Sequence, residues 1–244
     1  MNKIQERFHE IRKFCEKNAD PDIVKKYARY FTEGYDAYGL DPEKYESQRD
    51  KWLEQWGKDF TLDDFLLLGD KLVATGKYEE ASFALGFMYS IKEKFTPDTF
   101  EKLGNWLENG IANWAHTDVL AGKALSHFIT KNIIGLESLK KWTESASKWK
   151  RRSVPVLLID SLKTDIPLDR LFKAIQPLML DSDKFVQKGL GWFLREAWKV
   201  HPQETEDFLL KWKDTCGRII IQYATEKMDK DSKIKFRKDK KKPR

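Results

Sequence analysis

Cysteine is scarce in this sequence. Of the 244 residues only Cys15 and Cys216 are cysteines, and neither belongs to a CxxC pair or a Cys/His cluster. A disulfide framework and a structural zinc site both need such clusters. The four histidines show no metal-ligand spacing either. We therefore expect no disulfides and no metal, and a reducing compartment suits the chain best.

Long apolar runs are also missing. Nowhere does the sequence hold the ~18 consecutive apolar residues that a membrane-spanning helix requires. The first residues, MNKIQERFHEIRKFCEKN, interrupt their apolar positions with frequent charges, unlike a secretory signal. No GxGxxG, Walker or GxSxG motif occurs. We expect a cytoplasmic protein with no membrane partner and no cofactor.

Charge is abundant and unevenly distributed. Residues 1–110 hold 17 Lys and Arg against 22 Asp and Glu, whereas residues 111–232 hold 20 against 16. Residues 233–244 add eight basic residues and a single acidic one. A basic half followed by a basic tail suits a polyanionic partner, because each neutralised phosphate releases counterions. For the tail alone, solubility is an equally good explanation.

Apolar residues recur at the three- and four-residue spacing of helices almost throughout, as in Phe65, Leu68 and Leu72. Helix starts are marked where Asp or Thr precedes Pro at positions 20–21, 41–42 and 96–97. About a dozen short helices with tight turns predict an all-α, HEAT-like helical repeat solenoid with a basic concave face. A globular helical bundle is the alternative. We expect one domain over residues 1–228 and a basic, flexible tail over 229–244.

Aromatic and charged residues also combine in four places, one near the N-terminus and three in the second half. Trp114 and Asp118 are four residues apart, so an indole and a carboxylate share one helix face. Arg29 and Tyr30 place a cation beside another aromatic ring. Each signal is weak alone, because most tryptophans of helical proteins are core residues and a lone carboxylate can simply cap a helix.

The second half holds two dense basic segments. One opens a predicted helix and surrounds Trp149 with Lys148, Lys150, Arg151 and Arg152. The other places a basic stripe along one face of a longer helix with an indole at its centre, formed by Lys184, Lys188, Trp192, Arg195 and Lys199. Cations on either side of an aromatic plate are suited to a phosphate backbone, so we expect both segments to bind DNA.

At these residues a family resemblance becomes visible. Residues 185–196, FVQKGLGWFLRE, resemble the QKAIGW-x-LRE helix of the AlkD-like DNA alkylation repair enzymes. Residues 149–152, WKRR, are similar to that family's W-x-x-R element, and Trp114 with Asp118 to its W-x-x-x-D helix. Residues 28–30, ARY, match its N-terminal element. Order and spacing agree over residues 20–225.

The resemblance implies a role for particular residues. Asp118 matches the family's catalytic carboxylate, and Trp114 and Trp192 match its two aromatic walls. Arg152 matches a backbone-contacting arginine, and Tyr30 a further contact on the lesion side. The chain departs from the pattern directly after Trp114, where Ala115 replaces a common acidic residue and His116 follows. At about 200° around the helix from both Trp114 and Asp118, the His116 imidazole is expected to point away from the site.

The resemblance also implies an activity. We expect a monomeric, nucleoid-associated DNA glycosylase that hydrolyses the N-glycosidic bond of cationic alkylated purines in duplex DNA. Its substrates would be 3-methyladenine, 7-methylguanine and bulky N3 or N7 adducts, recognised without a base-flipping pocket. The main alternative is a noncatalytic repeat protein that binds bent, branched or damaged DNA. A scaffold for a protein or RNA partner is a third interpretation.

Overall fold

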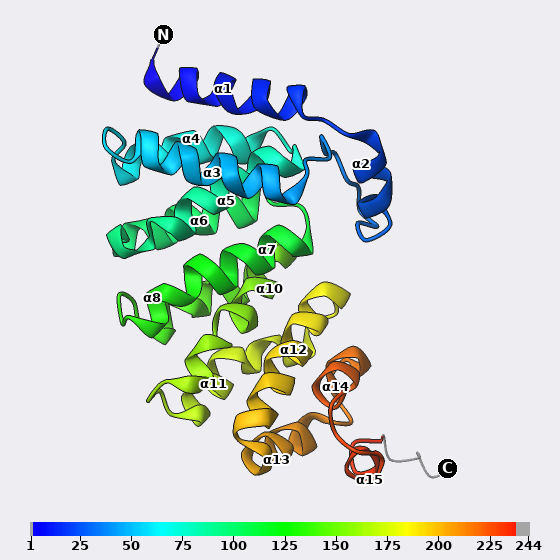
Figure 1. Ribbon diagram of the computed structural model, residues 1–244. Helices are drawn as coiled ribbons and strands as arrows, with labels where there is room; N and C mark the ends of the chain where they lie inside the picture. The colour runs from blue at the N-terminus through cyan, green and yellow to red at the C-terminus, as the bar shows by residue number, and fades with distance from the viewer. Residues whose placement is uncertain (1, 238–244) are drawn as a thin grey trace. The chain divides into compact units, whose positions relative to one another are not determined.

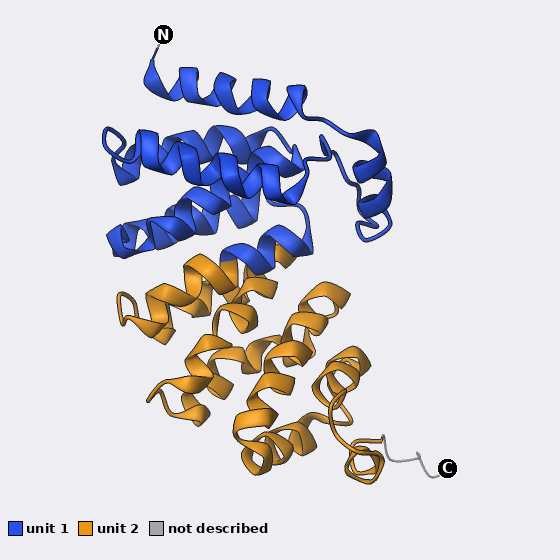
Figure 2. Ribbon diagram, viewed as in Figure 1, with its two compact units in different colours: residues 1–120 blue, residues 121–244 orange. Residues whose placement is uncertain are grey.

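The protein was analysed as a computed structural model, which describes residues 2–237. Every regular element in that range is helical and no β-strand occurs there (Figure 1), so the predicted all-α fold is confirmed. The chain divides into two compact units, Met1–Leu120 and Ala121–Arg244 (Figure 2). The concave basic face predicted from the sequence depends on how such units are joined and stays a prediction.

Unit 1 consists of helices packed side by side, with α4 against α1, α5 and α6, and α5 against α3 and α7 (Figure 1). Its core is rich in large aromatic side chains, including Trp52, Phe65, Phe83 and Phe87. The elements are α1 (Lys3–Lys17), α2 (Pro21–Ala28), α3 (Pro42–Trp56), α4 (Leu62–Ala74), α5 (Tyr78–Ser90), η1 (Lys92–Lys94), α6 (Pro97–Asn109) and α7 (Trp114–Leu120).

The helix starts predicted at the three Pro positions are confirmed. Pro21, Pro42 and Pro97 are the first residues of α2, α3 and α6. The Asp20 and Asp41 side chains accept hydrogen bonds from the first free amides of α2 and α3. Pro is tolerated at this position because its missing N–H would have had no partner within the helix.

Unit 2 is built around α12, which packs against α10, α13 and α14. Its elements are η2 (a π turn, Ala121–Leu125), α8 (Ser126–Thr130), η3 (Leu136–Leu139), α9 (Lys140–Thr143), α10 (Lys148–Leu157), η4 (Asp160–Lys163), α11 (Leu168–Ile175), η5 (Gln176–Leu180), α12 (Lys184–Val200), α13 (Pro202–Trp212), α14 (Arg218–Ala224) and α15 (Lys230–Ile234). A close contact joins α12 to α14: a Cβ added at Gly191 would lie 2.3 Å from the Cβ of Tyr223.

The predicted flexible tail does not begin at residue 229. Asp229 caps α15 through the amides of Asp231 and Ser232, and the side chain of Phe236 is 1% exposed. The guanidinium of Arg218 also donates to the carbonyl oxygen of Phe236 at 2.8 Å. A helix and a buried side chain thus lie within residues 229–237, a stretch that the sequence assigned to the tail. The rest of the expected tail, residues 238–244, lies outside the described residues.

Candidate nucleic-acid interface

Helix α7 carries Trp114 and Asp118. Asn113 caps it, since its Oδ1 accepts from the backbone N–H of His116 at 2.9 Å and its carbonyl oxygen accepts from the Thr117 hydroxyl. Trp114, the first residue of the helix, is 36% exposed. Asp118 follows one turn later and is half-buried. The helix spacing predicted for this pair is therefore present, with the indole at the surface of unit 1.

The Trp114 indole lies against the segment between α2 and α3. Its Nε1–H donates to the carbonyl oxygen of Tyr30 at 3.1 Å. Its ring stacks on Phe31 with centroids 5.9 Å apart, and Phe31 in turn stacks on Tyr35 at 4.5 Å. Tyr30 itself is 52% exposed and lies beneath the guanidinium of Arg29. The structure thus places Tyr30 beside Trp114, a contact that the sequence could not show.

Phe31 and Tyr35 were missed by sequence reasoning. The aromatic spacing of residues 27–38, YARYFTEGYDAY, was the available signal. No local pattern in it indicates a contact with Trp114, which lies about 80 residues further along the chain. Only the fold shows that this loop meets the start of α7.

The segment between α2 and α3 is bonded to the start of α5, where the four consecutive residues 77–80 make the contacts. Lys77 pairs with Asp36 at 2.5 Å, and the backbone N–H of Tyr78 donates to the Asp36 carbonyl oxygen at 2.8 Å. The Glu79 carboxylate accepts from the backbone amides of residues 38, 39 and 40 at 2.8, 2.8 and 3.2 Å. Glu80 accepts from the Tyr38 hydroxyl at 2.8 Å. The loop is therefore a fixed part of unit 1.

Glu79 and Glu80 are both buried. Burial alone would raise the pKa of Glu80, but hydrogen bonds from Arg12 and Tyr38 outweigh that effect, and its pKa lies below its ordinary value. The bond to Arg12 is bidentate, with nitrogen to oxygen distances of 2.9 and 3.2 Å. A buried carboxylate needs such partners to stay charged.

His116 points into unit 1, as its helical position predicted. Its side chain is buried, stacks on Tyr78 with ring centroids 4.3 Å apart, and lies 2.9 Å from the Ser82 hydroxyl through Nε2. Nδ1 lies 3.0 Å from Nδ2 of Asn113. Since an amide nitrogen only donates, Nδ1 must accept and Nε2 carries the proton. Burial lowers the pKa of His116 to about 4, so it is neutral at physiological pH.

Unit 2 gathers three lysines around one aromatic ring. The Nζ atoms of Lys148, Lys184 and Lys188 lie 5.3, 5.1 and 5.8 Å from the centroid of Phe185. Phe185 is itself buried and packs on Trp149, with the two ring centroids 5.0 Å apart. We call these three ammonium groups the lysine cluster. They come from the first turn of α10 and the first two turns of α12, so both basic segments found in the sequence contribute to one positive patch.

The other basic residues of the α10 segment face inward. Arg151 donates to Asp181 at 2.6 Å and to the carbonyl oxygens of Ser145 and Ala146. Lys150 and Arg152 are each only 6% exposed. The Lys150 ammonium lies over Trp142 at 5.0 Å, and Arg152 donates to the carbonyl oxygen of Phe185 at 2.6 Å.

These three residues therefore correct the expectation that the whole segment is a DNA-contacting surface. Arg151, Lys150 and Arg152 hold α10 to its neighbours in unit 2. Helix periodicity explains why the sequence misled: consecutive residues at about 100° intervals cannot all face the same solvent side.

Along α12 the predicted basic stripe is present, but carboxylates pair with the cations of its C-terminal half. Lys184 is exposed, and Lys188 and Trp192 are half-buried. Arg195 pairs with Glu196 at 3.2 Å and with Glu226 at 2.5 Å, and Lys199 pairs with Glu196 at 2.7 Å. Arg195 was expected to bind DNA, but neighbouring carboxylates already neutralise it. The positive half of the stripe is the N-terminal one, where it joins the lysine cluster.

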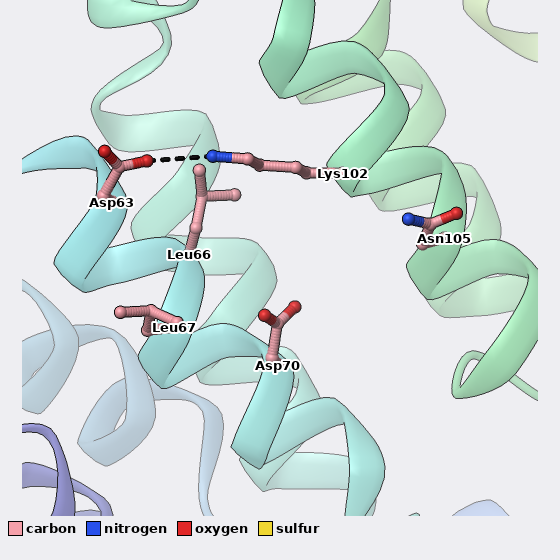
Figure 3. Close-up of a pocket in the computed structure, with 6 residues that line it drawn as sticks. All are labelled: Asp63, Leu66, Leu67, Asp70, Lys102 and Asn105. Atoms are coloured by element: carbon pink, nitrogen blue, oxygen red, sulfur yellow. Dashed lines mark hydrogen bonds and ion pairs between the residues drawn. The ribbon is translucent and has the colours of Figure 1, made fainter.

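A surface pocket of unit 1 has the opposite charge. It lies between α4 and α6 and is lined by Asp63, Leu66, Leu67, Asp70, Lys102 and Asn105 (Figure 3). Lys102 is paired with Asp63 at 2.9 Å. The Asp70 carboxylate accepts from the indole N–H of Trp106 at 2.6 Å. A pocket with two carboxylates is a poor site for phosphate.

Among residues 2–237, no group of three or more His, Cys, Asp or Glu side chains is placed to hold a metal ion. No helix in that part of the chain is both long and apolar enough to span a membrane.

Comparison with known proteins places the chain in a family. The family described as "DNA alkylation repair enzyme" matches residues 11–228. The chain belongs to this family. No curated protein matches the sequence. Among solved structures, one described as "Predicted DNA alkylation repair enzyme from Enterococcus faecalis" is similar, with a TM-score of 0.76 and 17% identity, covering 87% of this chain and 98% of that one.

This comparison bears on the fold. At 17% identity the structural likeness shows that the two chains fold alike and nothing finer. The family match covers Trp114, Asp118, the lysine cluster and Trp192, and it leaves out the last residues of the chain. The sequence resemblance to DNA alkylation repair enzymes is thus confirmed at the level of the family.

Proposed function

We propose that this family member is a DNA glycosylase that excises cationic alkylated purines from duplex DNA, acting as a cytoplasmic monomer. The observation that carries the proposal is the family match together with α7, which presents an exposed indole and, one turn later, a carboxylate. Asp118 is the proposed catalytic residue. Trp114 and Trp192 are the proposed aromatic contacts to the lesion.

The proposed chemistry asks little of the protein. In 7-methylguanine and 3-methyladenine the base carries a positive charge, so the bond from C1′ of deoxyribose to the base is already weakened. As that bond breaks, its electron pair leaves with the base, which departs neutral. Water then bonds to C1′ and gives up a proton. A carboxylate stabilises the cationic sugar and orients the water, so Asp118 is sufficient and no general acid is needed.

The position of His116 supports a mechanism in which Asp118 acts without a general acid. A general acid must reach the leaving base while protonated. His116 is buried against Tyr78 and Ser82, and its pKa of about 4 keeps it neutral near pH 7. We therefore propose that neutral lesions such as uracil, hypoxanthine and 1,N6-ethenoadenine are not substrates.

The lysine cluster supports DNA binding in the proposal. The cluster places three ammonium groups within 5.8 Å of one ring centroid. A phosphate bound beside them would release counterions from the DNA. Contacts of this kind hold the duplex without reading its sequence. In the proposal, Lys148, Lys184 and Lys188 are the backbone contacts kept from the set expected from the sequence, whereas the arginines of that set have internal partners.

The test is Asp118→Asn compared with wild type and with Asp63→Asn, which removes a carboxylate from α4 of the same unit. Release of 7-methylguanine from methylated duplex is measured in single turnover, and DNA affinity in parallel. We expect Asp118→Asn to lower the release rate by about 100-fold or more, as loss of one electrostatic contact to a transition state does, with DNA affinity equal or slightly better. Asp63→Asn should behave as wild type.

Equal release by Asp118→Asn and wild type would refute the catalytic assignment. Absence of release by the wild type, with DNA binding intact, would instead favour the noncatalytic DNA-binding alternative.

A further inference from the structure

We propose that the segment between α2 and α3 is a support that positions Trp114, and that Phe31 and Glu79 are its positioning residues. The inference deepens the proposed function and rests on it, because it assigns how the lesion-contacting indole is held. Neither residue touches the proposed substrate. Both act through Trp114.

The need for a support follows from where Trp114 lies. It is the first residue of α7 and is 36% exposed. The capping by Asn113 and the burial of His116 fix the backbone of α7, but they do not fix the rotamer of the Trp114 side chain. An exposed indole at a helix terminus populates several rotamers unless something outside the helix selects one.

The loop supplies two contacts that together select one rotamer. The Tyr30 carbonyl oxygen accepts from the indole Nε1–H at 3.1 Å. Phe31 covers one face of the indole, with an interplanar angle of 16°. The hydrogen bond fixes the edge of the indole and the stacked ring fixes its plane. Phe31 is backed by Tyr35, which lies nearly parallel to it at 8°.

Glu79 makes this loop rigid. Its buried carboxylate accepts from three successive backbone amides, those of Tyr38, Gly39 and Leu40. The middle residue must be glycine, because its φ is +82° and an added Cβ would lie 2.1 Å from the carbonyl oxygen of Asp20. That close approach also joins the loop to the start of α2, where the Asp20 N–H donates to the Tyr38 carbonyl oxygen at 2.9 Å.

The chain of contacts therefore runs from α5 through Glu79 to the loop, and from the loop through Phe31 to Trp114. Removing either link should leave the indole in place for only part of the time. Catalysis is sensitive to such looseness, since a displacement of ~1 Å can cost about 100-fold in rate.

The test uses Phe31→Leu and Glu79→Gln. Gln at position 79 keeps the volume but puts an NH2 group where an oxygen accepts from the backbone. The matched control is Trp106→Phe, which removes the part-buried hydrogen bond from the α6 indole to Asp70 of α4 and leaves the loop untouched. All variants are full-length, and each is assayed for 7-methylguanine release in single turnover and for DNA affinity.

We expect both loop variants to slow release by about 10-fold or more while DNA affinity changes by less than about 3-fold, because misplacement of a reacting contact affects the transition state more than ground-state binding. Trp106→Phe should lower the melting temperature by about as much as the two loop variants do, but should release 7-methylguanine at the wild-type rate. If all three variants slow release in proportion to lost stability, the role is merely structural and the proposal is refuted.

A second readout does not depend on activity. Trp114 in its stacked position contributes to the near-ultraviolet circular dichroism spectrum. Its signal is the difference between the spectra of the wild type and of Trp114→Phe. That signal should weaken in Phe31→Leu and Glu79→Gln and persist in Trp106→Phe. If the wild type releases no base, the proposed function fails while this signal still decides whether the loop holds Trp114. An unchanged signal in Phe31→Leu, whose half-buried side chain can be shortened without unfolding the unit, would overturn the proposal.

Discussion

Acidification should destabilise unit 1 through one histidine. His116 is buried without a carboxylate among its hydrogen-bond partners, which are Ser82, Asn113 and the backbone of Tyr78, and the Tyr78 ring stacks on its imidazole. Tyr78 stays neutral, because burial raises its pKa to about 12. Burial lowers the pKa of His116 from 6.5 to about 4. The unfolded chain therefore takes up a proton at this residue at a higher pH than the native protein does.

The sign and the pH window follow from these two values. Above pH 6.5 the histidine is neutral in both states and contributes no pH dependence. Between pH 6.5 and about 4 only the unfolded chain is protonated, so stability falls as the pH falls. A difference of about 2.5 pKa units corresponds to about 3 kcal/mol once both states are protonated, and to about 2 kcal/mol at pH 5.

The assay is urea unfolding of wild type and His116→Gln at pH 7.5 and pH 5. Gln keeps a donor near the Ser82 hydroxyl but cannot take up a proton. The free energy of unfolding of the wild type should fall by about 2 kcal/mol more than that of the variant between these pH values. The difference between the proteins cancels titration of the other histidines. Parallel pH dependences would show that the imidazole is not held neutral by burial, and the reasoning would be wrong.

Three further predictions concern DNA. Alanine at Lys148, Lys184 or Lys188 should weaken binding to any duplex and reduce the slope of log affinity against log salt concentration by about one unit per lost phosphate contact. In the same salt titration Lys199→Ala should leave that slope unchanged, because Lys199 already pairs with Glu196. Deleting residues 238–244 should reduce the nonspecific affinity for DNA without lowering the melting temperature. Deletion from residue 233 onward should lower the melting temperature, because Phe236 is buried. Equal melting temperatures of the two truncations would contradict the packing of α15 on the rest of unit 2. Duplexes that carry uracil or hypoxanthine should release no base in the assay used for 7-methylguanine, and release that is lost in His116→Ala would show acid catalysis by that residue.

Much of the fold could be predicted from local sequence. The Asp-Pro and Thr-Pro signals place the starts of α2, α3 and α6 because capping and the missing proline N–H are local effects. The basic stripe around Trp192 was predicted to lie on one long helix, and α12, Lys184–Val200, carries it. The spacing of Trp114 and Asp118 on α7 was likewise visible in the sequence.

What the sequence could not show depends on contacts between distant segments. The inward orientation of Arg151 follows from Asp181, 30 residues away. The loop that supports Trp114 lies 84 residues before it, and no local pattern connects them. The burial of Phe236 depends on the tertiary position of α15. In each case a charge or an aromatic ring looked solvent-facing because its partner was far along the chain.

Around α10 and α12, three arginines and the lysine cluster lie beside different groups. The guanidinium groups of Arg151, Arg152 and Arg195 are spent on carboxylates and carbonyl oxygens within unit 2, whereas the ammonium groups of the lysine cluster rest on an aromatic ring. Acetylation neutralises lysine and leaves arginine unaltered. We therefore expect a lysine-acetylating reagent to remove the positive charge of this surface while the internal arginine bonds remain, and so to weaken the proposed binding of DNA there.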